Sequence, residues 1–133
     1  MPKIRQGKNK YNARKTLIDG IMFDSAAEAH RYKELKLLER AGEICNIRVQ
    51  VPFIFLLHGK KMFTYSADFV YRNKNQLFVV EDVKGVKTPV YRLKKKLIEA
   101  QHEITINEIS YRRLDSRQTV KKQLVRVFRK EKL

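Results

Sequence analysis

The chain has 133 residues, which is enough for one compact domain and too short for two comfortable ones. Its 43% hydrophobic content supports a folded core, while 30 Lys and Arg residues against 14 Asp and Glu residues give a net charge of +16. Such a balance predicts a polyanionic partner, either nucleic acid or an acidic membrane surface. The single cysteine excludes a disulfide framework and a cysteine-based zinc site. No apolar run approaches the roughly 20 residues that span a bilayer, so we expect a protein that is not inserted in a membrane. Because the chain has no disulfide framework, we expect it in the reducing cytoplasm.

The first 15 residues carry Lys or Arg at six positions and no acid. We predict that residues 1–15 form a flexible basic arm that contacts phosphates, with a merely solubilising tail as the alternative. Residues 16–133 would then form a single domain. Within residues 16–23, the Asp19-Gly20 pair between short apolar runs predicts a tight β-hairpin.

A helix is predicted from Ser25 to Ala41, with Gly42 as its stop signal. Its first residues fit a capping box, in which Ser25 caps the helix and Glu28 reaches back to the Ser25 amide. Alternating apolar residues then predict a strand over Ile44–Leu57, and Pro52 places that strand at a sheet edge. The apolar runs at 62–71 and 77–83 flank polar residues 72–76, a pattern typical of a second hairpin. Its aromatic residues are expected in the core; they are Tyr65, Phe69, Tyr71 and Phe78.

This hairpin contains charges that an ordinary strand pair would not need. Asp82 and Lys84 point to the same face, because side chains alternate along a strand. A turn centred near Lys74 would place Asp68 opposite Val80 and diagonal to Asp82, about 7–8 Å away. Two carboxylates and a lysine would then converge, and such oxygen ligands suit Mg²⁺. The alternative is a surface hairpin with an Asp–Lys ion pair.

Beyond the hairpin, Thr88-Pro89 predicts a helix start, and the helix would run to about Gln101 with Leu93 and Leu97 on its buried side. A short strand is predicted over 104–109, and a last helix with a basic outer face begins at Ser116. The predicted order is helix, three strands, helix, strand, helix.

The pair Ala67-Asp68 and the run Asp82-Val83-Lys84 on a hairpin resemble the motif of the PD-(D/E)XK nuclease superfamily, with Ala67 where that family has proline. The resemblance covers residues 16–109. It implies an α/β fold of the restriction-endonuclease type: an α-β-β-β-α-β core whose mixed sheet is flanked by helices. The basic arm and the C-terminal helix would be additions to this core. Within this superfamily, the chain resembles small phage-encoded endonucleases of the junction-resolving or transposon end-cleaving type.

The resemblance also implies a chemistry: Mg²⁺-dependent hydrolysis of DNA phosphodiesters, with Mn²⁺ as a substitute metal. Asp68, Asp82 and the backbone carbonyl of Val83 would hold the ion, and Glu28 on the first helix would supply a third acid. Lys84 would orient the attacking water or neutralise the transition state. Glu28 therefore has two competing roles, as the capping-box acid or as a metal ligand.

The implied substrate is DNA, branched or otherwise structured, cut by a phage or mobile-element enzyme in the bacterial cytoplasm. A homodimer would be needed to cut two strands. A different class of protein fits the same composition, namely a non-catalytic nucleic-acid-binding protein whose hairpin acids only pair with lysines.

Overall fold

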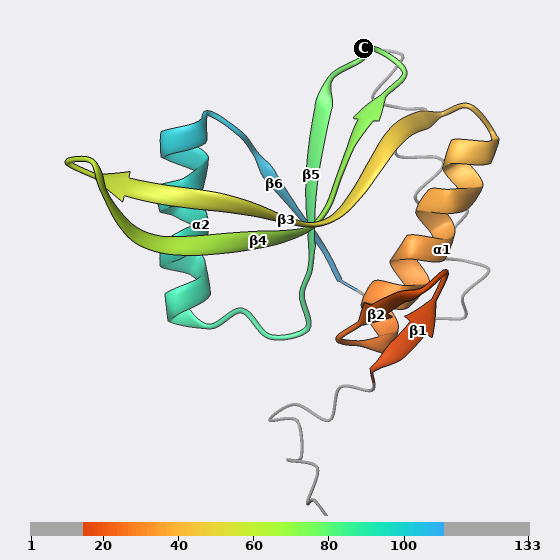
Figure 1. The fold of residues 1–133 in the computed structure, drawn as a ribbon, viewed down its shortest axis with the longest axis horizontal. Coiled ribbons are helices and arrows are strands. Elements are labelled where there is room, and N and C mark those ends of the chain that lie inside the picture. Colours follow the sequence, from red (N-terminus) through yellow and green to blue (C-terminus); the bar gives the residue numbers. More distant parts are fainter. Residues whose placement is uncertain (1–14, 111–133) are drawn as a thin grey trace, which may run out of the picture.

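The computed structural model describes residues 15–110, so nearly all of the predicted basic arm and the whole predicted C-terminal helix lie outside the described residues. Two helices and six strands follow one another along this part of the chain (Figure 1). Their bounds are β1 (Thr16–Ile18), β2 (Ile21–Phe23), α1 (Ala26–Arg40), β3 (Ile44–Leu57), β4 (Lys60–Asn73), β5 (Phe78–Val83), α2 (Pro89–His102) and β6 (Ile106–Ile109).

The first two strands form the predicted tight hairpin. Asp19 and Gly20 both have positive φ, 51° and 75°, as the favoured two-residue hairpin turn requires. The hairpin is fastened to α1, because the hydroxyl of Tyr32 donates a hydrogen bond of 3.1 Å to Asp19 Oδ2. The rings of Phe23 and Tyr32 lie 5.0 Å apart in the same contact. The hairpin therefore covers the start of α1 (Figure 1).

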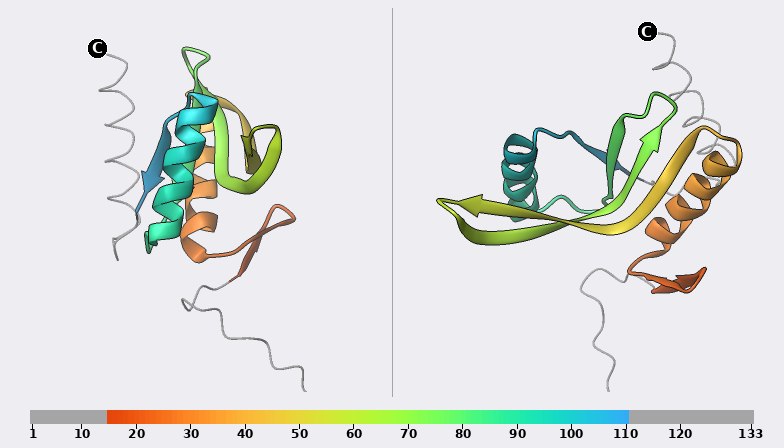
Figure 2. Two further views of the ribbon diagram at one scale, coloured as in Figure 1. Left: turned by 90° about the vertical axis from the view of Figure 1, so that its left-hand side faces the viewer. Right: turned by 45° about the horizontal axis from the view of Figure 1, so that its top comes forward.

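The remaining strands form one mixed sheet in the order β3-β4-β5-β6. The first three are antiparallel neighbours, whereas β6 runs parallel to β5. A parallel pair needs a crossover, and α2 supplies it. Pro52 lies in β3 at the edge of the sheet, as predicted. The α/β class with a mixed sheet is thus confirmed, and β3 and β4 extend from the sheet as a long curved hairpin (Figures 1 and 2).

Each helix packs on its own cluster of buried side chains. The cluster at α1 contains Phe23, Ala29, Tyr32, Leu35, Leu38, Ile44, Phe69, Tyr71 and Val83. The cluster at α2 contains Tyr65, Ala67, Val70, Val80, Tyr91, Ile98 and Ile106. Since successive residues of β5 alternate between the two clusters, the helices cover opposite faces of the sheet.

Both predicted helix starts are confirmed. Ser25 Oγ accepts a hydrogen bond of 3.1 Å from the amide of Glu28, and Thr88 Oγ1 accepts one of 3.1 Å from the amide of Tyr91. The predicted buried side of α2 is wrong for Leu93, which is 58% exposed, whereas Leu97 is half-buried. The helix buries Tyr91 instead, and Leu93 lies on the opposite side because two helical positions differ by about 200°.

The predicted register of the second hairpin is also wrong. Val70 pairs with Val80, and continuing that register places Asp68 directly opposite Asp82. The turn is centred on Asn75 instead of Lys74: the Asn73 amide bonds to the Leu77 carbonyl, and the Asn73 side chain accepts hydrogen bonds from the amides of Asn75 and Leu77. One expected core residue is also outside: Phe78 is 57% exposed. No helix among the described residues has the length and apolar composition needed to cross a membrane.

Candidate active site

A row of polar side chains crosses the sheet from one edge to the other. Asp68 on β4 and Asp82 on β5 are opposite each other, and Asp82 in turn pairs with Glu108 on the parallel strand β6. On the other side of Asp68, the Gln50 side chain on β3 donates a hydrogen bond of 3.3 Å to Asp68 Oδ1. The sheet therefore gathers three carboxylates from three strands in one line.

Asp68 is held by both neighbouring strands. Its Oδ2 accepts a hydrogen bond of 2.7 Å from the backbone amide of Val83, while its Oδ1 accepts the bond from Gln50. Burial is the largest cause that raises the pKa of Asp68, and together with the neighbouring acids Asp82 and Glu28 it brings this pKa to about 8. Two carboxylates side by side disfavour each other's charged form. The site would therefore be stabilised by an added positive charge.

Asp82 is 1% exposed and has two partners. The hydroxyl of Tyr65 donates a hydrogen bond to Asp82 Oδ2, and Lys84 Nζ lies 3.4 Å from Asp82 Oδ1. Asp82 and Lys84 thus point the same way, as predicted, whereas Val83 packs in the cluster at α1. Burial raises the pKa of Tyr65, and the Asp82 carboxylate adds to this effect, so Tyr65 remains a hydrogen-bond donor.

Glu28 approaches this group from the first turn of α1. Burial raises its pKa, the charges of Asp24 and Asp82 raise it further, and Lys84 lowers it. Its Oε2 is buried and has no hydrogen-bond partner within the described residues. The Ser25 half of the predicted capping box is present. The structure therefore brings Glu28 into the electrostatic environment of Asp82 and leaves its Oε2 without a hydrogen-bond partner among the described residues.

Two contributors to this site were not identified from the sequence, and for a third, Gln50, an ordinary strand role was preferred over a role in positioning the substrate. Tyr65 was expected only in the core, and Tyr91 on α2 was not singled out, although Lys84 Nζ lies 4.5 Å from its ring centroid. Gln50 reads as an ordinary strand residue, yet its φ of 52° is left-handed. Such conformations cost free energy in a non-glycine residue and cluster at functional sites. None of these contacts has a sequence signal, because each depends on the strand register.

A second group of charges on the other face of the sheet contrasts with the first. Arg31 on α1 binds both oxygens of Glu81, at 2.8 and 2.5 Å. Tyr71 also donates a 2.5 Å hydrogen bond to Glu81, and Arg31 reaches Glu34 at 3.0 Å. Here every acid faces a cation or a donor, so this cluster is a structural ion pair network between α1 and β5. In the group around Asp68, by contrast, Asp82 forms an ion pair with Lys84, while Asp68 and Glu28 form none among the described residues.

The chemistry of the donors fits a hard divalent cation. Mg²⁺ binds oxygen ligands, commonly one or two carboxylates, and completes its shell with water and substrate phosphate. Asp68 and Asp82 provide the carboxylates, and the open oxygen of Glu28 provides a further anionic group. Within residues 15–110, no set of three or more acidic, histidine or cysteine side chains is already arranged to hold a metal ion. Val83 enters the site through its amide, and its carbonyl remains a predicted ligand.

Comparison with known proteins identifies the family to which the chain belongs. A family model described as a protein of unknown function (DUF1064) matches residues 8–124. Neither the curated proteins nor the solved structures yielded a match. The match includes every strand and helix described above. Because it covers most of the chain, the protein belongs to the DUF1064 family.

Proposed function

We propose that this protein is a divalent-metal-dependent endonuclease that hydrolyses phosphodiester bonds in DNA. The observation that carries the proposal is the group formed by the buried Asp68 and Asp82 and the half-buried Glu28, with Lys84 Nζ 3.4 Å from Asp82 Oδ1. The protein has a net charge of +16, yet these three acids lie together with only one of them in an ion pair among the described residues. Perturbed pKa values in a cluster of acids favour a functional site over a merely structural one.

The order of elements supports the same proposal. From α1 to β6 the chain follows helix, three strands, helix and strand, with the sheet between the two helices. This is the α-β-β-β-α-β order of the PD-(D/E)XK superfamily, which the sequence motif resembles. Asp68 lies on the second strand of that order and Asp82 on the third, where the motif requires its two acids.

In the proposed site, Asp68, Asp82, Glu28 and the carbonyl of Val83 would hold Mg²⁺, or Mn²⁺ in its place. The bound cation would stabilise negative charge on the scissile phosphate and make water a better nucleophile at neutral pH. Lys84 would orient the attacking water or stabilise charge that develops on the phosphate.

The surrounding residues would keep this machinery in position. The Val83 amide and Gln50 fix the two oxygens of Asp68, and Tyr65 fixes Asp82. Partners of metal-binding carboxylates typically orient them and tune their charge. The ring of Tyr91 lies beside the Lys84 ammonium and would restrict where that ammonium can reach.

The alternative is a non-catalytic nucleic-acid-binding protein whose acids serve only to pair with lysines. The Asp82–Lys84 pair at 3.4 Å is the observation that favours it. Among the described residues, however, neither Asp68 nor Glu28 forms an ion pair with a lysine. This alternative therefore does not explain why two of the three acids are present. We therefore prefer the nuclease. Its proposed substrate is branched or structured DNA, cut by a homodimer of phage or mobile-element origin.

The test is a panel of linear, nicked, flapped and four-way DNAs incubated with Mg²⁺, Mn²⁺ or EDTA. A double variant, Asp68→Asn with Asp82→Asn, purified in the same way, controls for contaminating nucleases. We expect cleavage by the wild-type protein with either metal and none in EDTA or with the double variant. Tight binding to these DNAs without cleavage in either metal would favour the binding protein.

A further inference from the structure

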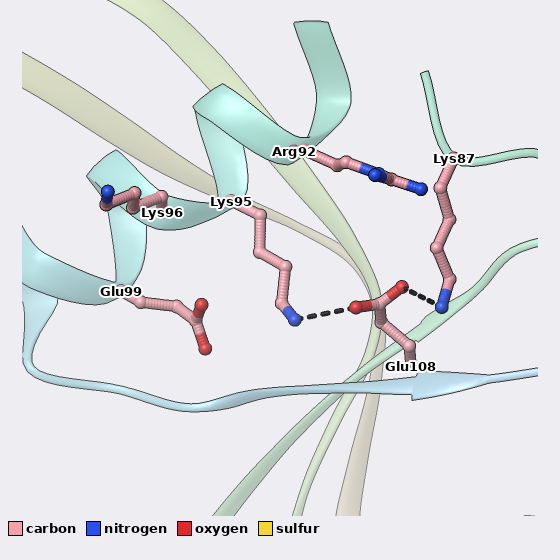
Figure 3. Close-up of a pocket in the computed structure, with 6 residues that line it drawn as sticks. All are labelled: Lys87, Arg92, Lys95, Lys96, Glu99 and Glu108. Atoms are coloured by element: carbon pink, nitrogen blue, oxygen red, sulfur yellow. Dashed lines mark hydrogen bonds and ion pairs between the residues drawn. The ribbon is translucent and has the colours of Figure 1, made fainter. Parts of the chain in front are cut away.

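A hollow of about 380 Å³ lies beside α2, between the loop that precedes this helix and strand β6. Figure 3 shows the side chains around it. Four of the six residues that line it are cations. The lining residues are Lys87, Arg92, Lys95, Lys96, Glu99 and Glu108. We call this hollow the cationic pocket.

The cationic pocket adjoins the candidate active site. Glu108 pairs with Asp82 on the neighbouring strand, and neighbouring strands are about 4.8 Å apart. The start of α2 touches both places, since the ring centroid of Tyr91 lies 4.5 Å from Lys84 Nζ and the next residue, Arg92, lines the pocket. A group held in the cationic pocket would therefore lie one strand away from the acids.

The acids of the cationic pocket are already engaged. Glu108 binds Lys95 at 2.7 Å and Lys87 at 3.0 Å, and these ion pairs lower its pKa although burial alone would raise it. Glu99 accepts a hydrogen bond of 2.9 Å from the amide of Ile106. Glu108 thus holds two lysines at the wall of the pocket and keeps them extended (Figure 3).

The other two cations are exposed on α2, at positions 92 and 96, one helical turn apart. Neither Arg92 nor Lys96 forms an ion pair within the described residues, in contrast to Lys87 and Lys95. In Figure 3 the Arg92 side chain extends from the helix toward Lys87. The cationic pocket consequently has two cations in excess of its acids, and a guanidinium is among them.

We propose that the cationic pocket binds a backbone phosphate of DNA close to the phosphate that is cut. The DNA as ligand rests on the proposed function, while the pocket itself rests on the geometry above. A guanidinium offers paired N–H donors that match phosphate oxygens, and lysine ammonium groups add point charges. Held in this way, the phosphate would set the register of the strand relative to Asp68 and Asp82.

Arg92→Ala tests the proposal, with Lys94→Ala as the matched control. Both residues are cations on α2, but Lys94 Nζ lies 5.4 Å from the Phe63 ring centroid, on the side of the β3–β4 hairpin. Affinity for a labelled oligonucleotide is measured in EDTA, where no cleavage is expected, over a range of salt. We expect Arg92→Ala to weaken binding about tenfold and to lower the salt slope by about one unit, because one phosphate contact is lost. Lys94→Ala should have a clearly smaller effect.

Oligonucleotides with one neutral methylphosphonate linkage, moved along the strand, make the test position-specific. At one linkage, neutralisation should weaken wild-type binding but add nothing to the defect of Arg92→Ala. Equal effects of Arg92→Ala and Lys94→Ala, or additive effects at every linkage, would overturn the cationic pocket as a phosphate site. These binding results do not depend on turnover, so a wild-type protein that fails to cut DNA would refute the nuclease while leaving the pocket to be judged on the methylphosphonate result.

Discussion

The carboxylate of Asp68 on β4 accepts a 2.7 Å hydrogen bond from the backbone amide of Val83 on β5. This bond joins the first acid of the motif to the middle residue of its second half. It also holds Asp68 beside Asp82, although burial and this neighbouring carboxylate raise the pKa of Asp68. The fold therefore maintains an arrangement that is unfavourable until a cation compensates it, and this is the physical basis of the proposed metal site.

Glu28 can be tested as a cap or as a ligand. Glu28→Gln keeps a side chain that a capping box accepts, so a purely structural role predicts almost no change in melting temperature or activity. We expect cleavage to be lost while the melting temperature holds, because the Oε2 atom is buried without a partner. Ser25→Ala is the matched control: it should cost about 1 kcal/mol of stability and retain cleavage. Unchanged cleavage by Glu28→Gln would remove Glu28 from the site.

Tyr65→Phe removes the hydroxyl that donates to Asp82 and leaves the ring in the core at α2. Loss of such a supporting partner typically lowers metal affinity or activity about 10- to 100-fold. We expect the Mg²⁺ concentration for half-maximal cleavage to rise, with partial recovery of the rate at high Mg²⁺. A Mg²⁺ titration of the single-turnover rate measures this. Wild-type dependence on Mg²⁺ would mean that Tyr65 only fills space.

Lys84→Ala separates catalysis from docking. Lys84 is one of 30 Lys and Arg residues, so as a phosphate contact it should change the salt slope of binding by at most about one unit. As a group beside the attacked phosphate, its loss should lower the rate at saturating DNA by about 10²–10³-fold. Single-turnover cleavage across protein concentration distinguishes these outcomes.

Deletion of residues 1–10 is the counterpart of Lys84→Ala, because these residues carry four cations and no acid. The deletion should weaken binding and flatten its salt dependence while the rate at saturation is retained. If Lys84→Ala behaves like this deletion, shifting the binding curve and keeping the plateau rate, the hairpin is a docking surface.

The buried pair of Arg31 and Glu81 should govern stability instead of activity. Arg31 is 4% exposed, and Arg31→Met leaves Glu81 buried without its cation. Removing one partner of a buried ion pair lowers the free energy of unfolding by about 3–5 kcal/mol. The double variant Arg31→Met with Glu81→Leu should recover part of that loss. Urea denaturation of the three proteins measures it; equal stability of Arg31→Met and wild type would contradict the assigned role.

Much of this fold could be predicted from local signals. Asp19-Gly20, Ser25 and Thr88-Pro89 set a turn and two helix starts through interactions with residues close in sequence. The strand over Ile44–Leu57 followed from the period of two, and its place at a sheet edge followed from Pro52, which has no N–H to donate. These features depend on the nearest few residues and therefore appear in the sequence.

The register of the site could not be predicted in the same way. Whether Asp68 faces Val80 or Asp82 depends on whether the turn is centred on Lys74 or on Asn75. The hydrogen bonds of Asn73 with Asn75 and Leu77 belong to the second arrangement. A shift of register changes which residues are opposite each other across the whole pair of strands. For that reason the contacts of Asp82 with Tyr65, and of Asp68 with Gln50, emerged only from the structure.

The most direct test of the central claim is cleavage and DNA binding by Asp82→Asn, measured together under single-turnover conditions with Mg²⁺. The substitution keeps the size of the side chain and removes one charge from a group in which acids already repel. The account predicts wild-type folding, equal or tighter DNA binding, and loss of cleavage, since losing a metal ligand should cost several kcal/mol of transition-state stabilisation. A variant that still cuts DNA within about tenfold of the wild-type rate would contradict the assignment of Asp82 to a metal site.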